Sequence, residues 1–189
     1  MTKGFREHKQ EAVNTLQASI KVGDADEEIL PLLEKINALL DYYTTSSCAG
    51  RIVVFQDRGG KFASDFLGKW HLKADASEVL ATIKPCRGTL WFRVEPPIIH
   101  VGCESLSAAA KMMEAAQSSG FKRTGLQSLK DERYMLEILS TERFDAPIMK
   151  DEKMLVSEDY IGFLVGLANE KITKSREKLE RLDAAIESF

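Results

Sequence analysis

The sequence predicts an α+β fold, in which a mixed β-sheet core is flanked by helices and followed by a long C-terminal helix. Three observations lead to this prediction. Apolar residues recur at helical spacing within residues 1–41, and the same period returns from about residue 157. Short β-branched and aromatic runs, separated by Gly and Pro, occupy residues 42–140. Because helices precede and follow this strand-rich segment, the order favours α+β over a doubly wound parallel sheet.

The first 41 residues predict two amphipathic helices. Gly23 ends the first helix, whose apolar stripe consists of Phe5, Ala12, Val13, Leu16 and Ile20. Asp24 and Glu27 then have the spacing of a capping box. The apolar stripe that follows this box, over residues 29–40, predicts the second helix.

Several short segments between the helical ends have the composition of strands. They are residues 52–55, a weaker run at 70–73, and residues 89–94, 98–101, 121–129 and 133–140. Pro96 and Pro97 cannot donate to a ladder, and they therefore separate the strand at 89–94 from the next one. Two helices are predicted among these strands. Asp75 and Glu78 cap a short one, and a longer one over residues 105–119 ends at Gly120.

The C-terminal helix keeps its apolar period for about 30 residues, or roughly 45 Å at 1.5 Å per residue. Its apolar positions are Ile161, Leu164, Val165, Ala168, Ile172, Leu179, Leu182 and Ile186. Because this length exceeds what a domain core needs, we expect the helix to cross the sheet and pair with the N-terminal helices. The prediction is a single domain over residues 1–189, with helices in 1–41, a core in 42–140 and the long helix from about 157.

Composition excludes several classes of protein. With 189 residues, 44% of them hydrophobic, the chain can bury one core without disulfides or metals. Cys48, Cys86 and Cys103 form no CxxC pair and the three histidines are scattered, so neither a disulfide framework nor a metal site is predicted. The longest apolar run, residues 160–168, is far shorter than the roughly 20 residues of a membrane span. Since the first residues also lack an apolar leader, we expect a cytoplasmic protein with no membrane partner.

The densest polar cluster, TTSSCAGR, occupies residues 44–51 between the second predicted helix and the first predicted strand. Its hydroxyl, thiol and guanidinium groups, with backbone amides in a turn, suit an anionic or polar ligand. The alternative is an ordinary helix-to-strand loop, because loops commonly use Ser, Thr and Gly. Both interpretations place these residues in a loop.

A second cluster of polar and aromatic residues lies on the strand at residues 89–94. Period-two alternation places Trp91, Arg93 and Glu95 on one face, with His100 on the neighbouring strand. The opposite, core-facing set is Leu90, Phe92 and Val94. An indole, a guanidinium and a carboxylate together can stack a purine, bind a carboxylate and accept a proton. The alternative is a partly exposed sheet face with an Arg–Glu pair and a hydrogen-bonded histidine.

Residues 57–68 are predicted to form a loop, in which Arg58, Gly59–Gly60 and Lys61 either touch a ligand or only connect two strands. The sequence contains no dinucleotide or P-loop fingerprint. Residues 42–101 hold eight Lys and Arg against five Asp and Glu, whereas the whole chain has a net charge of −3. The sequence therefore predicts a small basic surface on an otherwise acidic protein.

These motifs together resemble the wybutosine-synthesis protein 3 family of archaeal and eukaryotic tRNA methyltransferases. The resemblance covers most of the chain, in the expected order. The matching segments are YTTSSCAGRI at 43–52, GKW at 68–70, FRVEP at 92–96, His100–Val101, SGF at 119–121, Ser140–Thr141, Pro147 and KMLVSEDY at 153–160. This sequence departs from the family at Ala49, where the family usually has Ser, and it lacks a Ser-His pair expected at about residues 74–75.

The resemblance implies methyl transfer from S-adenosylmethionine to N4 of the tricyclic guanosine at position 37 of phenylalanine tRNA, on a fold that is not a Rossmann methyltransferase fold. The implied partner is the anticodon loop. The alternatives are a non-catalytic tRNA-binding or partner-binding adaptor and a small-molecule enzyme. The oligomeric state does not follow from the sequence.

The motifs assign candidate site residues under this resemblance. Either Glu95 or His100 is the candidate proton acceptor. Those expected to bind the cofactor are Ser46, Ser47, Arg51, Trp91 and Arg93. Those expected to bind the substrate are Thr45, Cys48, Lys69 and Trp70, with Trp91 or Trp70 stacking an aromatic ring.

Overall fold

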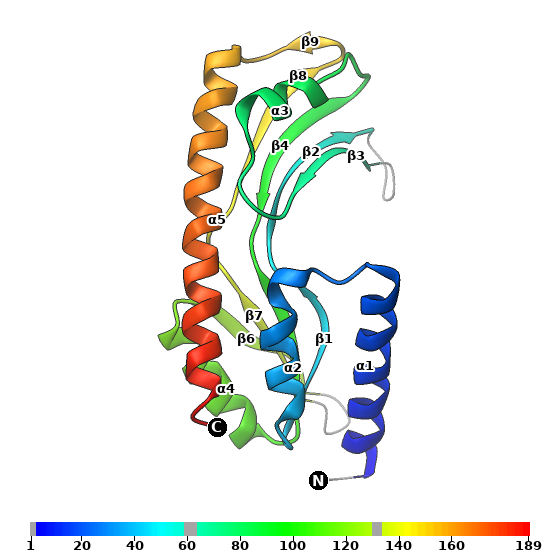
Figure 1. The fold of residues 1–189 in the computed structure, drawn as a ribbon, viewed down its shortest axis with the longest axis vertical. Coiled ribbons are helices and arrows are strands. Elements are labelled where there is room, and N and C mark those ends of the chain that lie inside the picture. Colours follow the sequence, from blue (N-terminus) through cyan, green and yellow to red (C-terminus); the bar gives the residue numbers. More distant parts are fainter. Residues whose placement is uncertain (1–2, 59–63, 130–133) are drawn as a thin grey trace. The chain divides into compact units, whose positions relative to one another are not determined.

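The computed structural model describes residues 3–58, 64–129 and 134–189, and it divides the chain into two compact units (Figure 1). Unit 1 is drawn from Met1–Ala49, Pro97–Thr141 and Arg176–Phe189, and unit 2 from Gly50–Pro96 and Glu142–Ser175. The predicted α+β class is confirmed, and so is the long C-terminal helix, α5 (Glu158–Ile186). None of the described helices is long and apolar enough to cross a membrane.

Unit 1 is built on a four-stranded sheet with the order β1-β5-β7-β6, in which each pair of neighbours is antiparallel. The strands are β1 (Tyr42–Cys48), β5 (Ile98–Cys103), β6 (Arg123–Ser128) and β7 (Tyr134–Leu139). The helices of this unit, besides the end of α5, are α1 (Lys3–Val22), η1 (Glu27–Ile29), α2 (Leu30–Ala38) and α4 (Leu106–Ser118).

One face of the unit 1 sheet carries the core. Val101, Leu136 and Ile138 are fully buried on alternate strand positions, as the period of a strand predicts. They belong to one hydrophobic cluster with residues of α2, α4 and the last turns of α5, which include Ile36 and Leu182. The expected pairing of the long helix with an N-terminal helix is therefore confirmed for α2.

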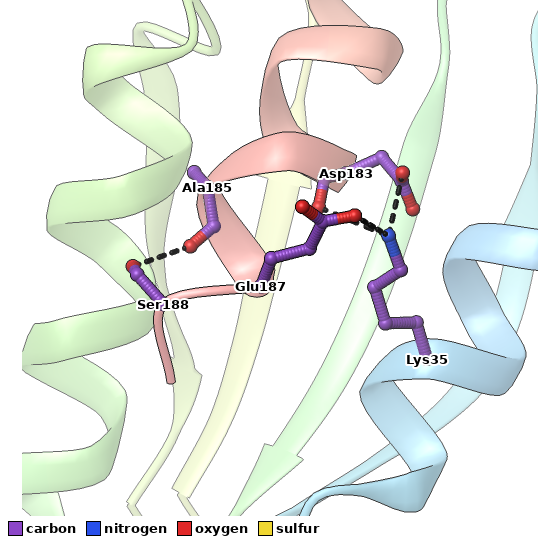
Figure 2. Close-up of polar contacts among 5 residues, drawn as sticks. All are labelled: Lys35, Asp183, Ala185, Glu187 and Ser188. Carbon is purple, nitrogen blue, oxygen red and sulfur yellow. Dashed lines mark hydrogen bonds and ion pairs between the residues drawn. The ribbon is translucent and has the colours of Figure 1, made fainter.

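An ion-pair cluster fixes the end of α5 against α2 (Figure 2). The Lys35 ammonium donates to Asp183 Oδ2 at 2.7 Å and to Glu187 Oε1 at 3.0 Å. These hydrogen bonds raise the pKa of Lys35, and the one to Asp183 has the largest effect. Beyond the helix, Ser188 Oγ donates to the Ala185 carbonyl at 2.8 Å, which gives one of the last carbonyls of α5 a partner.

Unit 2 is built on a five-stranded antiparallel sheet with the order β3-β2-β4-β8-β9. The strands are β2 (Arg51–Asp57), β3 (Ser64–Trp70), β4 (Thr89–Glu95), β8 (Phe144–Lys150) and β9 (Lys153–Met154). Phe92 and Ile148 are fully buried in a cluster that includes Ile161 of α5 and Val79 of α3 (Ala76–Thr82). Asp75 caps α3 as predicted, and the hydroxyl and amide of Ser77 donate to its carboxylate and lower its pKa.

The largest correction concerns residues 44–51, which were expected to form a loop. Residues Tyr42–Cys48 are a strand, β1, and only Ala49 and Gly50 form the turn into β2. Strand pairing overrides the turn preference of Ser and Thr here, because β1 hydrogen-bonds to β5 along most of its length. Strand β1 is an edge strand of the sheet. Gly50 has φ of 83°, a left-handed conformation that favours glycine.

The predicted loop at 57–68 and strand at 70–73 are also wrong in their bounds. Strand β3 begins at Ser64 and ends at Trp70, because it pairs with β2 from Asp57 back to Ile52. Part of the predicted loop, Gly59–Gly60 with Lys61, lies outside the described residues.

Two smaller expectations also need correction. The predicted Asp24–Glu27 box is wrong. Asp26 takes the N-cap position of η1, but its carboxylate accepts from the Ala49 amide instead of capping η1, and the N-cap position of α2 is Ile29. Strands β8 and β9 were not predicted, because Asp145 and Pro147 interrupt the apolar alternation of β8.

Tyr42 makes unit 1 lose stability as the pH becomes alkaline. Its hydroxyl donates to the Ala108 carbonyl at 3.0 Å, and burial raises the pKa of Tyr42 from 10.0 to about 12. The folded state keeps this proton where the unfolded chain has lost it, so the stabilisation is complete below pH 10 and is lost as the pH rises to about 12. The loss amounts to about 2–3 kcal/mol. Tyr42→Phe should flatten the pH dependence of the free energy of unfolding in this range, as followed by circular dichroism.

Tyr160→Phe is the matched control for this prediction, because Tyr160 is 45% exposed on α5. It should leave the slope between pH 10 and about 12 unchanged. An equal slope in wild type and Tyr42→Phe would contradict the assignment.

Candidate functional site

The residues predicted to form a site are divided between the two units. Unit 1 carries Thr45, Ser46, Ser47, Cys48 and His100. Unit 2 carries Arg51, Lys69, Trp70, Trp91, Arg93 and Glu95. Each group is described within its own unit.

Unit 1 contains a cavity of about 500 Å³ between α1, the segment that follows it and the edge strand β1. Its apolar wall consists of Ala12, Leu16, Ile29, Leu33, Tyr43 and Met135. Its polar lining includes Glu11, Asp24, Asp26, Thr45, Ser46 and Ser47. The cavity therefore offers an apolar surface, carboxylates and hydroxyls to one ligand.

A β-bulge shapes the side of the cavity that β1 provides. The register passes from Thr44 opposite Val101 to Ser47 opposite Ile99, so both Thr45 and Ser46 lie against the single residue His100. In a regular strand, neighbouring side chains point to opposite faces, whereas a bulge re-aims them. This irregularity explains how three consecutive residues can line the same cavity.

The turn after β1 is held by two charged side chains. Ala49 is fully buried, and its amide donates to Asp26 Oδ2 at 2.9 Å. Arg176 of α5 donates to the Ala49 carbonyl from Nη1. Burial lowers the pKa of Arg176, while Glu28 and Asp26 oppose this effect. Both backbone groups of Ala49 therefore have charged partners that fix the end of the strand.

His100 contacts two further strands. Its Nδ1 lies 2.9 Å from the carbonyl oxygen of Ser46, and its Nε2 lies 3.0 Å from Glu137 Oε2. Gln127 Nε2 in turn donates to Glu137 Oε1 at 2.9 Å. The sequence did not predict the last two residues. Glu137 lies opposite His100 because of the strand register, which the sequence alone does not reveal, and Gln127 lies at an irregularity in the pairing of β6 with β7.

In unit 2, one face of the sheet gathers cations over aromatic rings. Arg51, Phe55, Phe66, Lys69, Trp91 and Arg93 form what we call the aromatic–cationic face. The Arg93 guanidinium lies 4.4 Å from the Phe55 ring centre, and the Lys69 ammonium lies 4.4 Å from that of Phe66. Such contacts are favourable, because the ring face is electronegative.

Two carboxylates hold the arginines of this face. Arg51 Nε donates to Glu95 Oε2 at 2.7 Å, and Arg93 Nε donates to Asp145 Oδ1 at 2.9 Å. The side chains of Arg51 and Glu95 are each 25% exposed, so the pair remains in contact with solvent. The predicted alternation along β4 is confirmed, because Trp91, Arg93 and Glu95 are half-buried between fully buried neighbours.

Trp70 lies apart from the aromatic–cationic face. It pairs with Ile52 across β2, on the core face, and its indole Nε1 donates to Glu78 of α3 at 3.2 Å. Lys69, its neighbour in sequence, points to the other face, as alternation requires. The structure therefore does not bring Trp70 together with Trp91.

Three residues of this region escaped prediction: Phe55, Phe66 and Asp145. Phe55 lies in a predicted strand, and only the pairing with β3 and β4 shows which face it occupies. Phe66 fell in the predicted loop and Asp145 in an unpredicted strand. Over the part of the chain that the structure describes, no group of three or more His, Cys, Asp or Glu side chains could hold a metal ion.

Comparison with known proteins agrees with this architecture over the whole chain. A tRNA(Phe) 7-((3-amino-3-carboxypropyl)-4-demethylwyosine(37)-N(4))-methyltransferase 1 of Pyrococcus horikoshii is 40% identical, over 100% of this chain and 97% of the relative. A relative in Archaeoglobus fulgidus, named as the same methyltransferase activity, is 44% identical over 87% of this chain and 84% of its own length.

Solved structures and a family model extend this agreement. A protein structure from Pyrococcus horikoshii superposes with a TM-score of 0.91 at 41% identity, covering 96% of this chain and 95% of that chain. A hypothetical protein from Aeropyrum pernix superposes with a TM-score of 0.75 at 29% identity, covering 86% and 98%. The family model described as Methyltransferase TYW3 matches residues 7–188. Nearly every element described above lies within this match, and the chain belongs to the TYW3 methyltransferase family.

Proposed function

We propose that this chain methylates N4 of 7-(3-amino-3-carboxypropyl)-4-demethylwyosine at position 37 of tRNA(Phe). The observation that carries the proposal is the similarity to relatives named for this reaction, at 40% identity over 100% of the chain. Relatives named for the same activity occur in other archaea, including Methanocaldococcus jannaschii, at 39% identity over 94% of the chain. A match of this extent includes the residues of both units.

The unit 1 cavity fits the methyl donor S-adenosylmethionine, which supplies an electrophilic methyl group on a sulfonium. Its volume of about 500 Å³ is within the range of small-molecule sites. The apolar wall with Leu16 and Ile29 suits the adenine ring, and the Asp24 carboxylate suits ribose hydroxyls or the amino group. The hydroxyls of Ser46 and Ser47 on β1 suit the carboxylate.

The aromatic–cationic face of unit 2 suits the anticodon loop of the tRNA. Single-stranded RNA is recognised chiefly by stacking of unstacked bases on aromatic rings and guanidinium planes, with support from cations near phosphates. Arg51, Lys69 and Arg93 supply the cations, while Glu95 and Asp145 fix two of them. The face therefore combines a small positive charge with rings that are already held in place.

Glu95 is the proposed proton acceptor for the N4 proton. Methyl transfer needs an in-line nitrogen nucleophile, and positioning of the two reactants supplies most of the rate, with a weak base assisting. The ion pair with Arg51 holds one oxygen of the Glu95 carboxylate in place at the end of β4. We propose that this carboxylate orients the amino group and takes its proton.

Replacing the β1 hydroxyls should weaken cofactor binding. Titration calorimetry with S-adenosylhomocysteine should show binding to the wild type, and Ser46→Ala with Ser47→Ala should weaken it about tenfold, since each lost hydrogen bond costs about 0.5–1.5 kcal/mol. Ser107→Ala is the matched control, because this exposed hydroxyl lies on α4 outside the cavity lining. Absence of binding to the wild type would instead favour a non-catalytic tRNA adaptor.

Removing the proposed base should slow methylation. Labelled S-adenosylmethionine and tRNA(Phe) from a strain blocked at this step provide the assay. Glu95→Gln keeps the shape of the side chain and should lower the rate about 100-fold or more. Arg51→Ala should also lower it, because it releases Glu95. Glu170→Gln, an exposed position on α5, should leave the rate unchanged. Wild-type rates for both site variants would contradict the assignment.

Removing cations from the aromatic–cationic face should weaken tRNA binding with little effect on S-adenosylhomocysteine. Lys69→Ala and Arg93→Ala should each weaken it several-fold in a filter-binding or fluorescence titration, because each loses a stacking or phosphate contact. Because Arg51, Lys69 and Arg93 are the cations proposed to contact the RNA, the salt slope should correspond to about two or three phosphates. Lys174→Ala, at an exposed position of α5, is the control. A variant slope equal to the wild-type slope would contradict this RNA surface.

A further inference from the structure

His100 lies between two groups that can only accept hydrogen bonds. The Ser46 carbonyl oxygen faces Nδ1 at 2.9 Å, and the Glu137 carboxylate faces Nε2 at 3.0 Å. A neutral imidazole has one N–H and one bare nitrogen. With a neutral ring, one of these contacts would set an acceptor against an acceptor. Only the doubly protonated ring donates to both partners.

Gln127 supports the ionised form of Glu137. Its side-chain amide donates to Oε1 at 2.9 Å, which leaves Oε2 as the acceptor for His100. The side chains of His100 and Glu137 are only 26% and 23% exposed, so solvent has limited access to the pair. A charge-assisted contact of this kind is stronger than a neutral hydrogen bond.

The carbonyl group that His100 contacts belongs to Ser46, a residue of the bulge. Thr45 and Ser46 together lie against His100, and a bulge leaves a residue without its regular ladder partner. The Nδ1–H donor therefore replaces a ladder hydrogen bond at the point where β1 lines the cavity. Loss of this donor would let the bulge relax and displace the hydroxyls of Thr45 and Ser46.

We propose that Glu137 is a positioning residue, which holds His100 doubly protonated so that His100 clamps the Thr45–Ser46 bulge at the cavity. This inference rests on the proposed function, because it takes the cavity as the cofactor site. It gives His100 a role in orientation rather than in proton transfer. Glu137 does not line the cavity and acts only through His100.

Other titratable groups lie on the same face of the sheet or at the cavity. Cys48 of β1 pairs with Ile98 and Arg123 of β6 pairs with Leu139, which places both side chains on the face of His100. His8 and Glu11 of α1 line the cavity with Ser46. Among the described groups, the carboxylate of Glu137 is the one that contacts the ring through an ion pair.

The protonation state can be read directly from nitrogen-15 spectra of the histidine rings in the full chain. His100→Asn removes, and so assigns, the His100 signals. Near neutral pH, the wild type should show protons on both ring nitrogens. In Glu137→Gln the amide can donate to Nε2, so a neutral ring with its proton on Nδ1 should replace the charged one. A bare ring nitrogen in the wild type near neutral pH would overturn the proposal.

Cofactor binding tests the clamp independently. Glu137→Ala should weaken binding of S-adenosylhomocysteine about fivefold to tenfold, because the ring loses the partner that fixes its orientation. Glu137→Gln should stay within about twofold of the wild type, because its amide still holds the ring, which donates to Ser46. Glu180→Ala, at an exposed position of α5, is the matched control and should bind as the wild type does.

The outcomes separate this inference from the proposed function. If the wild type binds and both Glu137 variants match it, the clamp is overturned while the cofactor site stands. If the wild type does not bind, the proposed cofactor site fails, and the ring spectra still decide whether Glu137 holds the doubly protonated ring. If Glu137→Ala does not fold, the ring spectra of the wild type and of Glu137→Gln decide between the two protonation states.

Discussion

The antiparallel pairing of β1 with β5 is the constraint on which unit 1 depends. A shift of one residue would exchange the two faces of β1 and move Tyr42 and Thr44 out of the core. Gly102 leaves room for the Tyr43 ring in this register, since a Cβ at position 102 would overlap that ring, which lies opposite. Only after this register is set does the extra residue of the bulge fall opposite His100. The shape of the cavity wall thus depends on the register of β1 against β5.

Much of this fold could be predicted from local patterns. The apolar periods of α1, α4 and α5 and the alternation along β4 depend on neighbours within one element, and they were found where the pattern placed them. The polar composition of residues 44–51 favoured a loop, because the hydrogen bonds that make it a strand come from β5, about 50 residues later. The bounds predicted for β3 were wrong for the same reason, since its partner β2 decides its extent.

The candidate site shows the same limit more sharply. Composition pointed to Ser46, His100 and Glu95, because hydroxyl, imidazole and carboxylate groups are chemically distinctive wherever they occur. It could not point to Glu137 or Phe66, whose importance comes entirely from what lies across the sheet from them. A carboxylate on a strand is ordinary until the register sets it against a histidine. Strand pairing is thus the information that a single sequence lacks.

Both tryptophans of the chain, Trp70 and Trp91, lie in unit 2, whereas the cavity belongs to unit 1. Intrinsic tryptophan emission is therefore a built-in reporter of one half of the molecule. A ligand that enters the cavity has no indole beside it within its own unit. Any change in emission on cofactor binding would thus report an effect of the cofactor on unit 2, without a label having been attached to the protein.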